Sequence, residues 1–224
     1  MNDKELVAHH AAQQVKDGML VGLGTGSTAN CFIDALARRH KEEGLKVTTV
    51  SSSVISAIRA REAGLPLLAV EQVSRLDMYV DGADEVTPSL TLLKGRGSDL
   101  VKEKLLARAS DAFVVLVDRS KLVSRIGEKY PIPVEVIPFA WQMVKRRLEQ
   151  QGATGDLRPN ANKDGLAVTS HGSLVLDMTF DTALDETALD RLLNDTPGVV
   201  EHGIFPGLAT TVLVGHEGKI EEKA

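Results

Sequence analysis

The chain has 224 residues, 43% of them hydrophobic and 25% charged, which suits a globular protein with one large domain or one large and one small domain. The net charge is −5 and no dense basic stripe occurs, so we expect no nucleic-acid partner. No apolar run is long enough to span a bilayer and the N-terminus is polar, so we expect no membrane partner. The only cysteine, Cys31, excludes an intramolecular disulfide, and we place the protein in the cytoplasm.

The N-terminal half alternates between two hydrophobic periods. Apolar spacing predicts helices at 3–16, 29–37, 55–60 and 98–109, and strands at 19–23, 47–50, 66–70, 78–80 and 112–117. Such alternation predicts an α/β fold with a mostly parallel, Rossmann-like sheet flanked by helices. Ligands of such sheets bind at the carboxyl ends of the strands.

The pattern changes near Pro131 and Pro133, which suggest a linker. The predicted elements that follow are strand 134–137, helix 139–150, strands 153–158 and 173–180, helix 186–194 and strand 198–205. This βαββαβ order is that of a smaller ferredoxin-like α+β domain. An apolar strand at 208–214 is expected to return to the large sheet. We therefore expect a Rossmann-like domain at 1–129 plus 206–224, and a ferredoxin-like domain inserted at 130–205.

A glycine-rich turn with the sequence GLGTGST follows the first strand at 22–28. It lacks the last glycine of a dinucleotide fingerprint and the lysine of a P-loop. Glycines, hydroxyls and free N–H groups at a helix N-terminus favour a phosphate monoester on a small molecule. The alternative is a tight turn with Ser27 or Thr28 as helix N-cap, and the turn alone does not separate the two.

Carboxylates cluster at Asp81, Asp84 and Glu85, directly after a strand. They repel one another unless they are solvated, protonated or paired with a cation. A solvated turn is one interpretation. Lys94 ends a further short predicted strand that contains Leu92 and Leu93. A second interpretation is therefore that the lysine and the aspartates face one pocket. The six histidines show no metal-site spacing, and we expect no metal.

Two further polar residues have ambiguous patterns. Glu103 lies among apolar neighbours on the predicted helix 98–109, where burial would suit a general base. From pattern alone, an exposed helix glutamate is the more common reading. Lys121 is by itself an ordinary loop lysine.

Taken together, the ordered motifs resemble those of A-type ribose-5-phosphate isomerases. The shared segments are GLGTGSTA at 22–29, SSS at 51–53, VDGADE at 80–85, KGRG at 94–97, EK at 103–104, YPIPVEV at 130–136, PGVV at 197–200 and GIF at 203–205. Each motif is weak alone, but their order and spacing over nearly the whole chain are specific.

The resemblance implies an aldose–ketose isomerase that interconverts D-ribose 5-phosphate and D-ribulose 5-phosphate through an enediol, in the non-oxidative pentose phosphate pathway, without a cofactor. Glu103 matches the base that carries a proton between C1 and C2. Asp81 is assigned to sugar-ring opening and Lys94 to stabilising the enediolate oxygen. Asp84 is assigned to holding a hydroxyl or orienting Lys94.

The resemblance also implies how the sugar phosphate is held and how the chain assembles. The matching phosphate- and sugar-binding positions are Gly26, Ser27, Thr28, Gly95, Arg96, Gly97 and Lys121, with Thr25 and Lys4 as weaker candidates. A homodimer, or a tetramer of two dimers, is implied.

The chain departs from the family pattern at a few positions. Arg96 stands where glycine is common, and a positive φ there would strain it. Asp99 replaces a usually small residue near Glu103, and Val54 stands where a polar residue is frequent.

Two rivals remain. An amino-sugar phosphate deaminase would need a catalytic histidine near these loops, and none occurs there. A sugar-phosphate-sensing regulator would carry a DNA-binding helix-turn-helix, and this acidic chain offers DNA little to bind.

Overall fold

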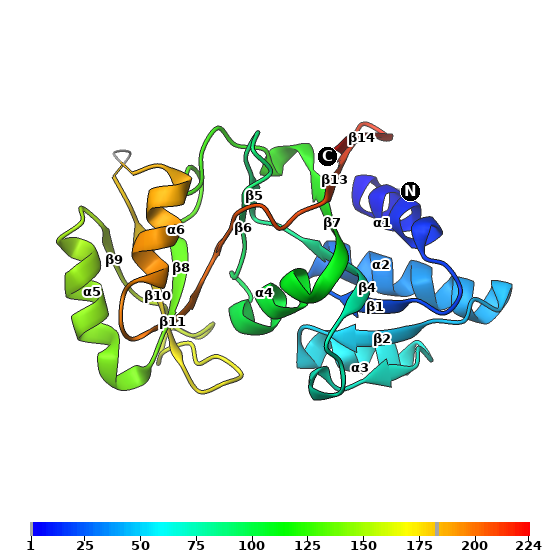
Figure 1. Cartoon of the computed structure of the whole chain (residues 1–224), viewed down its shortest axis with the longest axis horizontal. Coiled ribbons are helices and arrows are strands. Elements are labelled where there is room, and N and C mark those ends of the chain that lie inside the picture. Colours follow the sequence, from blue (N-terminus) through cyan, green and yellow to red (C-terminus); the bar gives the residue numbers. More distant parts are fainter. Residues whose placement is uncertain (1, 182–183) are drawn as a thin grey trace. The chain divides into compact units, whose positions relative to one another are not determined.

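The computed structural model describes residues 2–181 and 184–224, which divide into two compact units (Figure 1). The first unit comprises Met1–Ala83, Lys102–Leu122 and Gly207–Ala224, and the second comprises Asp84–Val101 and Val123–Pro206. The expected domain boundaries at 129/130 and 205/206 differ from this division by residues 84–101, 123–129 and 206. Both divisions return the C-terminal segment to the N-terminal unit.

The first unit is built on a seven-stranded sheet with the order β14-β13-β7-β4-β1-β2-β3. Its strands are β1 Leu20–Leu23, β2 Thr48–Ser51, β3 Leu67–Leu68, β4 Leu76–Gly82, β7 Ser110–Asp118, β13 Thr211–His216 and β14 Lys219–Lys223. Its helices are α1 Asp3–Gln14, α2 Ser27–Arg38, α3 Val54–Glu62 and α4 Leu100–Ala109, the last of which starts in the second unit. Short helical turns occur at η1 Arg39–Glu43, η2 Val70–Gln72 and η3 Arg119–Lys121. All neighbouring strands are parallel except β13 and β14, which confirms the mostly parallel sheet.

Alternating side chains give this sheet two buried faces. Val80 and Val114 pack into the core that α1 and α2 cover. Their chain neighbours Tyr79 and Phe113 point to the opposite face, where the two rings stack with centroids 4.9 Å apart. Burial on both faces explains the nearly continuous apolar runs of these strands.

The C-terminal segment joins the N-terminal helix at the edge of this sheet. Strand β13 pairs in parallel with β7, as expected for 208–214, and β14, which sequence analysis did not predict, extends the sheet further. The Gly218 N–H donates to an Asp3 side-chain oxygen over 3.0 Å, so the end of the chain (red in Figure 1) lies beside α1 (blue).

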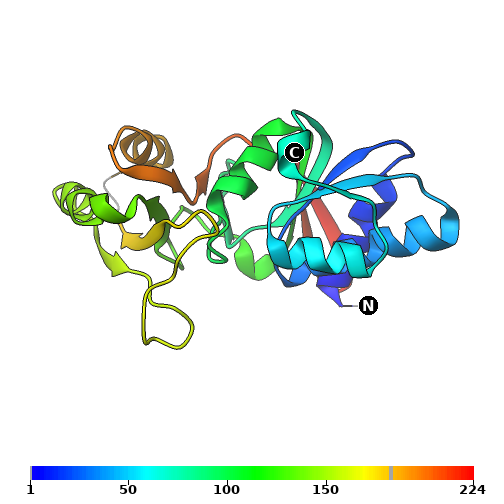
Figure 2. The same cartoon turned by 90° about the horizontal axis from the view of Figure 1, so that it is seen from below.

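The second unit contains two small antiparallel sheets, with the orders β11-β8-β10-β9 and β12-β6-β5. Its strands are β5 Glu85–Val86, β6 Leu92–Leu93, β8 Ile132–Val136, β9 Thr154–Leu157, β10 Leu174–Thr179, β11 Val199–His202 and β12 Ile204–Phe205. The helices α5 Trp141–Glu149, after the short turn η4 Pro138–Ala140, and α6 Glu186–Asn194 both pack on one face of the larger sheet (Figure 2). The order β8-α5-β9-β10-α6-β11 confirms the ferredoxin-like α+β fold.

The linker expected around Pro131 and Pro133 is wrong. Pro133 lies in β8, an inner strand paired with both β10 and β11. Proline cannot donate a ladder bond, but the Pro133 carbonyl accepts the Gly203 N–H over 2.8 Å. The strand expected at 66–70 is likewise shorter, because η2 begins at Val70.

A buried glutamate lies in the middle of the second unit. Glu135 of β8 is fully buried, and its Oε1 accepts the Thr169 hydroxyl over 2.8 Å. Burial raises the pKa of this carboxyl, and the hydrogen bonds from Thr169 and Ser173 offset only part of that effect. Folded protein therefore binds the Glu135 proton more tightly than unfolded protein does. As the pH rises above the ordinary pKa of glutamate, deprotonation of Glu135 lowers the free energy of unfolding.

We expect Glu135→Gln to remove this pH-dependent cost. Relative to the parent chain, the variant should gain free energy of unfolding between about pH 5 and about pH 8, because glutamine does not titrate. Urea unfolding at both pH values measures the difference, with the exposed Glu149→Gln as control. A variant whose stability changes with pH in parallel with the parent chain would contradict the assignment.

Candidate active site

The glycine-rich turn connects β1 to α2. Gly26 is the residue before the helix, with φ 109°, a conformation that L side chains rarely adopt. Helix α2 begins at Ser27, so neither Ser27 nor Thr28 is the N-cap, and that expectation is wrong. Because Gly26 makes the turn, both residues lie in the first turn of α2, beside its unsatisfied backbone N–H groups.

Gly24 makes room for Asp81. A Cβ at Gly24 would lie 2.1 Å from the Asp81 carboxyl carbon, so only glycine fits there. The fully buried Asp81 carboxylate accepts N–H groups from Thr25 over 3.0 Å and from Gly82 over 2.7 Å. The turn therefore holds a carboxylate that belongs to the neighbouring strand β4.

Tyr79 completes this cluster, and sequence analysis missed it. Its hydroxyl donates to Asp81 Oδ2 over 2.5 Å. Burial, followed by the charges of Asp81 and Glu103, raises the pKa of Tyr79 well above its ordinary value. Tyr79 therefore stays a neutral hydrogen-bond donor at physiological pH. Glu103 is only 4% exposed, so the interpretation as an exposed helix glutamate is wrong.

Hydroxyl groups from the serine loop brace the turn. Thr25 Oγ1 lies 2.9 Å from Ser52 Oγ and donates to Ser53 Oγ over 2.7 Å. Ser56 Oγ donates to the Gly24 carbonyl over 2.6 Å. The Thr25 side chain is thus committed to the fold, while its backbone N–H holds Asp81.

One lysine contacts the N-terminus of α2, and a second acts on the nearby end of β7. Lys4 Nζ donates to Ser27 Oγ over 3.0 Å. Burial raises the pKa of Asp118 at the end of β7, but hydrogen bonds from Ser120 and the charges of Lys121 and Lys4 together bring that pKa below its usual value. The charges of both lysines therefore act on Asp118. A lysine bonded to the first turn of a helix favours an anion there.

The remaining acidic-loop residues belong to the second unit and serve different purposes. Glu85 is fully buried and accepts three backbone N–H groups, from Gly127, Lys129 and Tyr130, over 2.6–2.9 Å. It is an anchor for that segment rather than part of a solvated turn. Asp84 is half-buried, and its N–H donates to the Leu93 carbonyl over 2.8 Å.

Lys94 follows the short strand β6 and is 4% exposed. Its N–H donates to the Gly203 carbonyl over 2.8 Å, and its ammonium lies 5.8 Å from the ring centre of Phe205. A cation over an aromatic face is stabilised electrostatically. Phe205 was not predicted as a neighbour of Lys94, because only the pairing of β12 with β6 brings them together.

The loop after Lys94 shows which residues have a positive φ. Positive φ occurs at Gly95, at 98°, and at Ser98, at 65°, and not at Arg96. Arg96 therefore fits its position without backbone strain, and its guanidinium lies 4.2 Å from the centre of the Tyr130 ring. Helix α4 begins at Leu100, so Asp99 precedes the first helical residue and is not inside the helix as expected.

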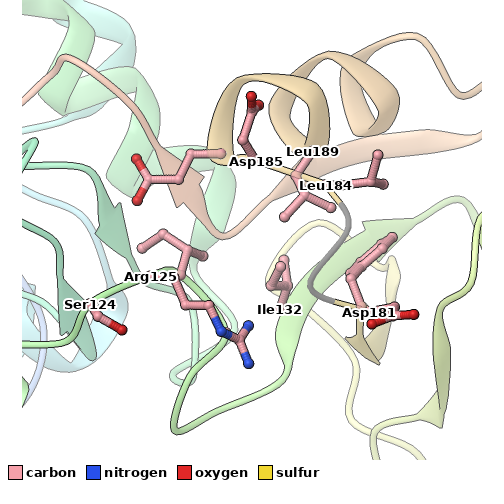
Figure 3. Close-up of a pocket in the computed structure, with 11 residues that line it drawn as sticks. Ser124, Arg125, Ile132, Asp181, Leu184, Asp185 and Leu189 are labelled. Atoms are coloured by element: carbon pink, nitrogen blue, oxygen red, sulfur yellow. The ribbon is translucent and has the colours of Figure 1, made fainter.

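A cavity of about 250 Å³ in the second unit is lined by none of the residues predicted for the site (Figure 3). Arg125 reaches into it, but Asp181, Asp185 and Glu186 also line it. Asp185 caps α6 through the Ala188 N–H at 2.8 Å, so it is used structurally. Three carboxylates against one guanidinium disfavour a phosphate there.

The polar residues of the first unit follow the carboxyl ends of β1, β2, β4 and β7. Within residues 2–181 and 184–224, no group of three or more acidic, histidine or cysteine side chains could hold a metal ion. No helix in that same part of the chain is both long and apolar enough to cross a membrane. Buried carboxylates and a lysine on the first turn of α2, at the carboxyl ends of parallel strands, are typical of one class: α/β proteins with a small-molecule site at that edge of the sheet.

Comparison with known proteins narrows this class. The family of ribose 5-phosphate isomerase A (phosphoriboisomerase A) matches residues 48–219. A ribose-5-phosphate isomerase A of Methanothermobacter thermautotrophicus is 46% identical over 96% of this chain and 94% of its own. The chain belongs to the ribose 5-phosphate isomerase A family.

Solved structures agree with this assignment. The ribose 5-phosphate isomerase A of Methanocaldococcus jannaschii is 41% identical, with a TM-score of 0.93 over 99% of this chain and 97% of that chain. A D-ribose-5-phosphate isomerase in complex with phospho-erythronic acid is 38% identical, with a TM-score of 0.95 over 100% of this chain and 99% of that chain. The fold expected from the family resemblance is therefore confirmed.

Proposed function

We propose that the protein interconverts D-ribose 5-phosphate and D-ribulose 5-phosphate as an aldose–ketose isomerase of the non-oxidative pentose phosphate pathway. Family membership over nearly the whole chain carries this proposal. The neighbour that binds phospho-erythronic acid supports it, because that ligand combines a phosphate with a carboxylate that resembles a planar enediolate.

Glu103 is the proposed base. It removes the C2 proton of the open-chain aldose; those electrons form the C1–C2 double bond, and the carbonyl π pair moves to O1. The O2 hydroxyl proton then passes to O1, and as the C2 carbonyl forms, the same carboxyl returns a proton to C1 to give the ketose. Burial of Glu103 in α4 supports this role because a partly desolvated carboxylate is a stronger base.

Three further polar residues complete the proposed chemistry. Asp81 assists opening of the sugar ring, and its fixed hydrogen bonds to Thr25, Gly82 and Tyr79 support a preorganised position. Lys94 stabilises negative charge on the enediolate oxygen, and its burial strengthens that interaction. Asp84 holds a substrate hydroxyl or orients Lys94.

The phosphate is proposed to bind at the N-terminus of α2. Ser27 and Thr28 supply hydroxyls, Gly26 and the first turn of α2 supply backbone N–H groups, and Lys4 and Lys121 supply charge, while Thr25 shapes the turn through its bond to Asp81. The Lys4 contact with Ser27 and the shared effect of both lysines on Asp118 support this position. The loop of Gly95, Arg96 and Gly97 is proposed to contact the sugar end.

We expect Lys4→Ala and Lys121→Ala each to raise the KM for ribose 5-phosphate at least about tenfold with little change in kcat, because a hydrogen bond to a charged group contributes about 1.5–3 kcal/mol. Initial-rate kinetics at low and high salt measure the effect, which should shrink as salt screens the charges. Lys41→Ala, an exposed lysine of η1, is the matched control. An unchanged KM in both variants would place the phosphate elsewhere.

A homodimer, or a tetramer of two dimers, working in the cytoplasm completes the proposal. Val54, Ile55 and Ile58 on α3 are 61%, 67% and 45% exposed, an apolar patch of the kind that marks protein contacts. The single cysteine fits a reducing compartment.

The direct test is conversion of ribose 5-phosphate into ribulose 5-phosphate by purified protein, followed as ketose formation. Absence of conversion would overturn the proposal. Release of ammonia from an amino-sugar phosphate would instead favour the deaminase.

A further inference from the structure

Arg158, directly after β9, has a guanidinium that makes two sets of hydrogen bonds inside the second unit. Nε and Nη2 donate to the two carboxylate oxygens of Asp177 on β10, over 2.8 and 2.6 Å. Nη1 donates to the Gly95 carbonyl over 3.0 Å, to the Arg96 carbonyl over 3.2 Å and to Ser98 Oγ over 2.9 Å. Its side chain is 13% exposed, so these bonds are largely shielded from water.

The loop that Arg158 contacts needs external support. Ser98 is a non-glycine residue with φ 65°, and Gly95 has φ 98°. Such conformations persist only where the surroundings hold them. Leu100 packs where a Gly95 Cβ would lie, at 1.9 Å, so the loop is tight on one side and bonded to Arg158 on the other.

Anchoring the carbonyls also orients the backbone N–H groups. In a trans peptide unit the C=O of one residue points opposite to the N–H of the next. When the Gly95 and Arg96 carbonyls face Arg158, the N–H groups of Arg96 and Gly97 point away from it. These two donors belong to the loop between Lys94 and the helix that carries Glu103.

We propose that Arg158, oriented by Asp177, is a positioning residue of the isomerase: it fixes the 95–98 loop so that the N–H groups of Arg96 and Gly97 can stabilise an anionic oxygen of the substrate. The effect of Arg158 on catalysis rests on the proposed function, whereas its effect on the order of the 95–98 loop does not. Asp177 keeps the guanidinium plane fixed through the bidentate pair, and a lysine at 158 could not make both sets of bonds.

The test combines kinetics with hydrogen–deuterium exchange of the peptide that covers residues 94–100. Arg158→Ala should lower kcat/KM at least about tenfold, mainly through kcat, since small misplacements of reacting groups are costly. Amide exchange should rise in that peptide and not in the peptides of the first unit. Free guanidinium should restore part of the activity of Arg158→Ala. The same addition should leave the activity of the parent chain unchanged. The exposed Arg147→Ala, from α5, is the control.

Arg158→Lys and Asp177→Asn keep the test decisive if Arg158→Ala does not fold, and each should show the same local exchange with a smaller kinetic loss. Unchanged exchange and kcat/KM within twofold of the parent chain would overturn the proposal. Loss of activity with exchange raised throughout the unit, and no rescue by guanidinium, would also overturn it, since that is general destabilisation. An inactive parent chain would instead contradict the proposed function. The exchange comparison would still show whether Arg158 holds the 95–98 loop.

Discussion

Glu103→Gln should lower kcat at least about a hundredfold while leaving the KM for ribose 5-phosphate within a few-fold of the parent value. Glutamine has nearly the same shape but cannot accept the C2 proton, and general bases contribute about 10²–10⁴ to the rate. Steady-state kinetics in both directions measure the effect, because one base serves both.

Glu149→Gln, an exposed helix glutamate of α5, is the matched control and should keep full activity. A Glu103→Gln variant that retains more than about a tenth of the parent kcat would show that another group moves the proton.

Gly24→Ala should damage both stability and activity. The added methyl group would lie 2.1 Å from Asp81 Cγ and Oδ1, so the carboxylate must move away from Thr25 and Tyr79. Overpacking of this kind costs about 1–3 kcal/mol of unfolding free energy. A displaced Asp81 should lower kcat/KM about a hundredfold, the loss typical of a 1 Å misplacement.

Urea unfolding and initial rates measure the two effects separately. Gly165→Ala, in the loop between β9 and β10, is the control: its Cβ would meet only the Asn160 side-chain nitrogen at 3.3 Å, so about 0.5 kcal/mol or less is expected. Full activity in Gly24→Ala would mean that the position of Asp81 does not matter to the reaction.

The fold could be predicted from sequence because its periodicities are strong. Helix 186–194 matches α6 to the residue, and the βαββαβ order was visible without knowing which strands pair. Pairing itself is a long-range property: β12 joins β6 across a sequence gap that no local pattern spans. The prolines led to the wrong prediction of a linker because proline usually marks a break in local structure. Pro133 fits within β8 because its carbonyl accepts a hydrogen bond and no N–H donor is required at that position.

The candidate site could be predicted only in part. Tyr79 was hidden because an apolar strand gives no sign of what its hydroxyl meets. The available signal was spacing, since Tyr79 and Asp81 are two residues apart in β4 and share one face of the sheet. The glycines of the turn favoured a phosphate, but the atoms nearest to a Cβ at Gly24 belong to Asp81. Pattern alone favoured exposure of Glu103, and its burial depends on tertiary packing.

Isomerisation of ribose 5-phosphate in D₂O, followed by NMR, tests the central claim most directly. If a carboxyl group that exchanges its proton with solvent transfers the proton through an enediol, deuterium should appear at C1 of the ribulose 5-phosphate formed. With Glu103→Gln, almost no deuterium should appear at C1 over the same reaction time. Product that carries the original C2 hydrogen at C1 in every turnover, with no solvent deuterium, would point to hydride transfer and contradict the account.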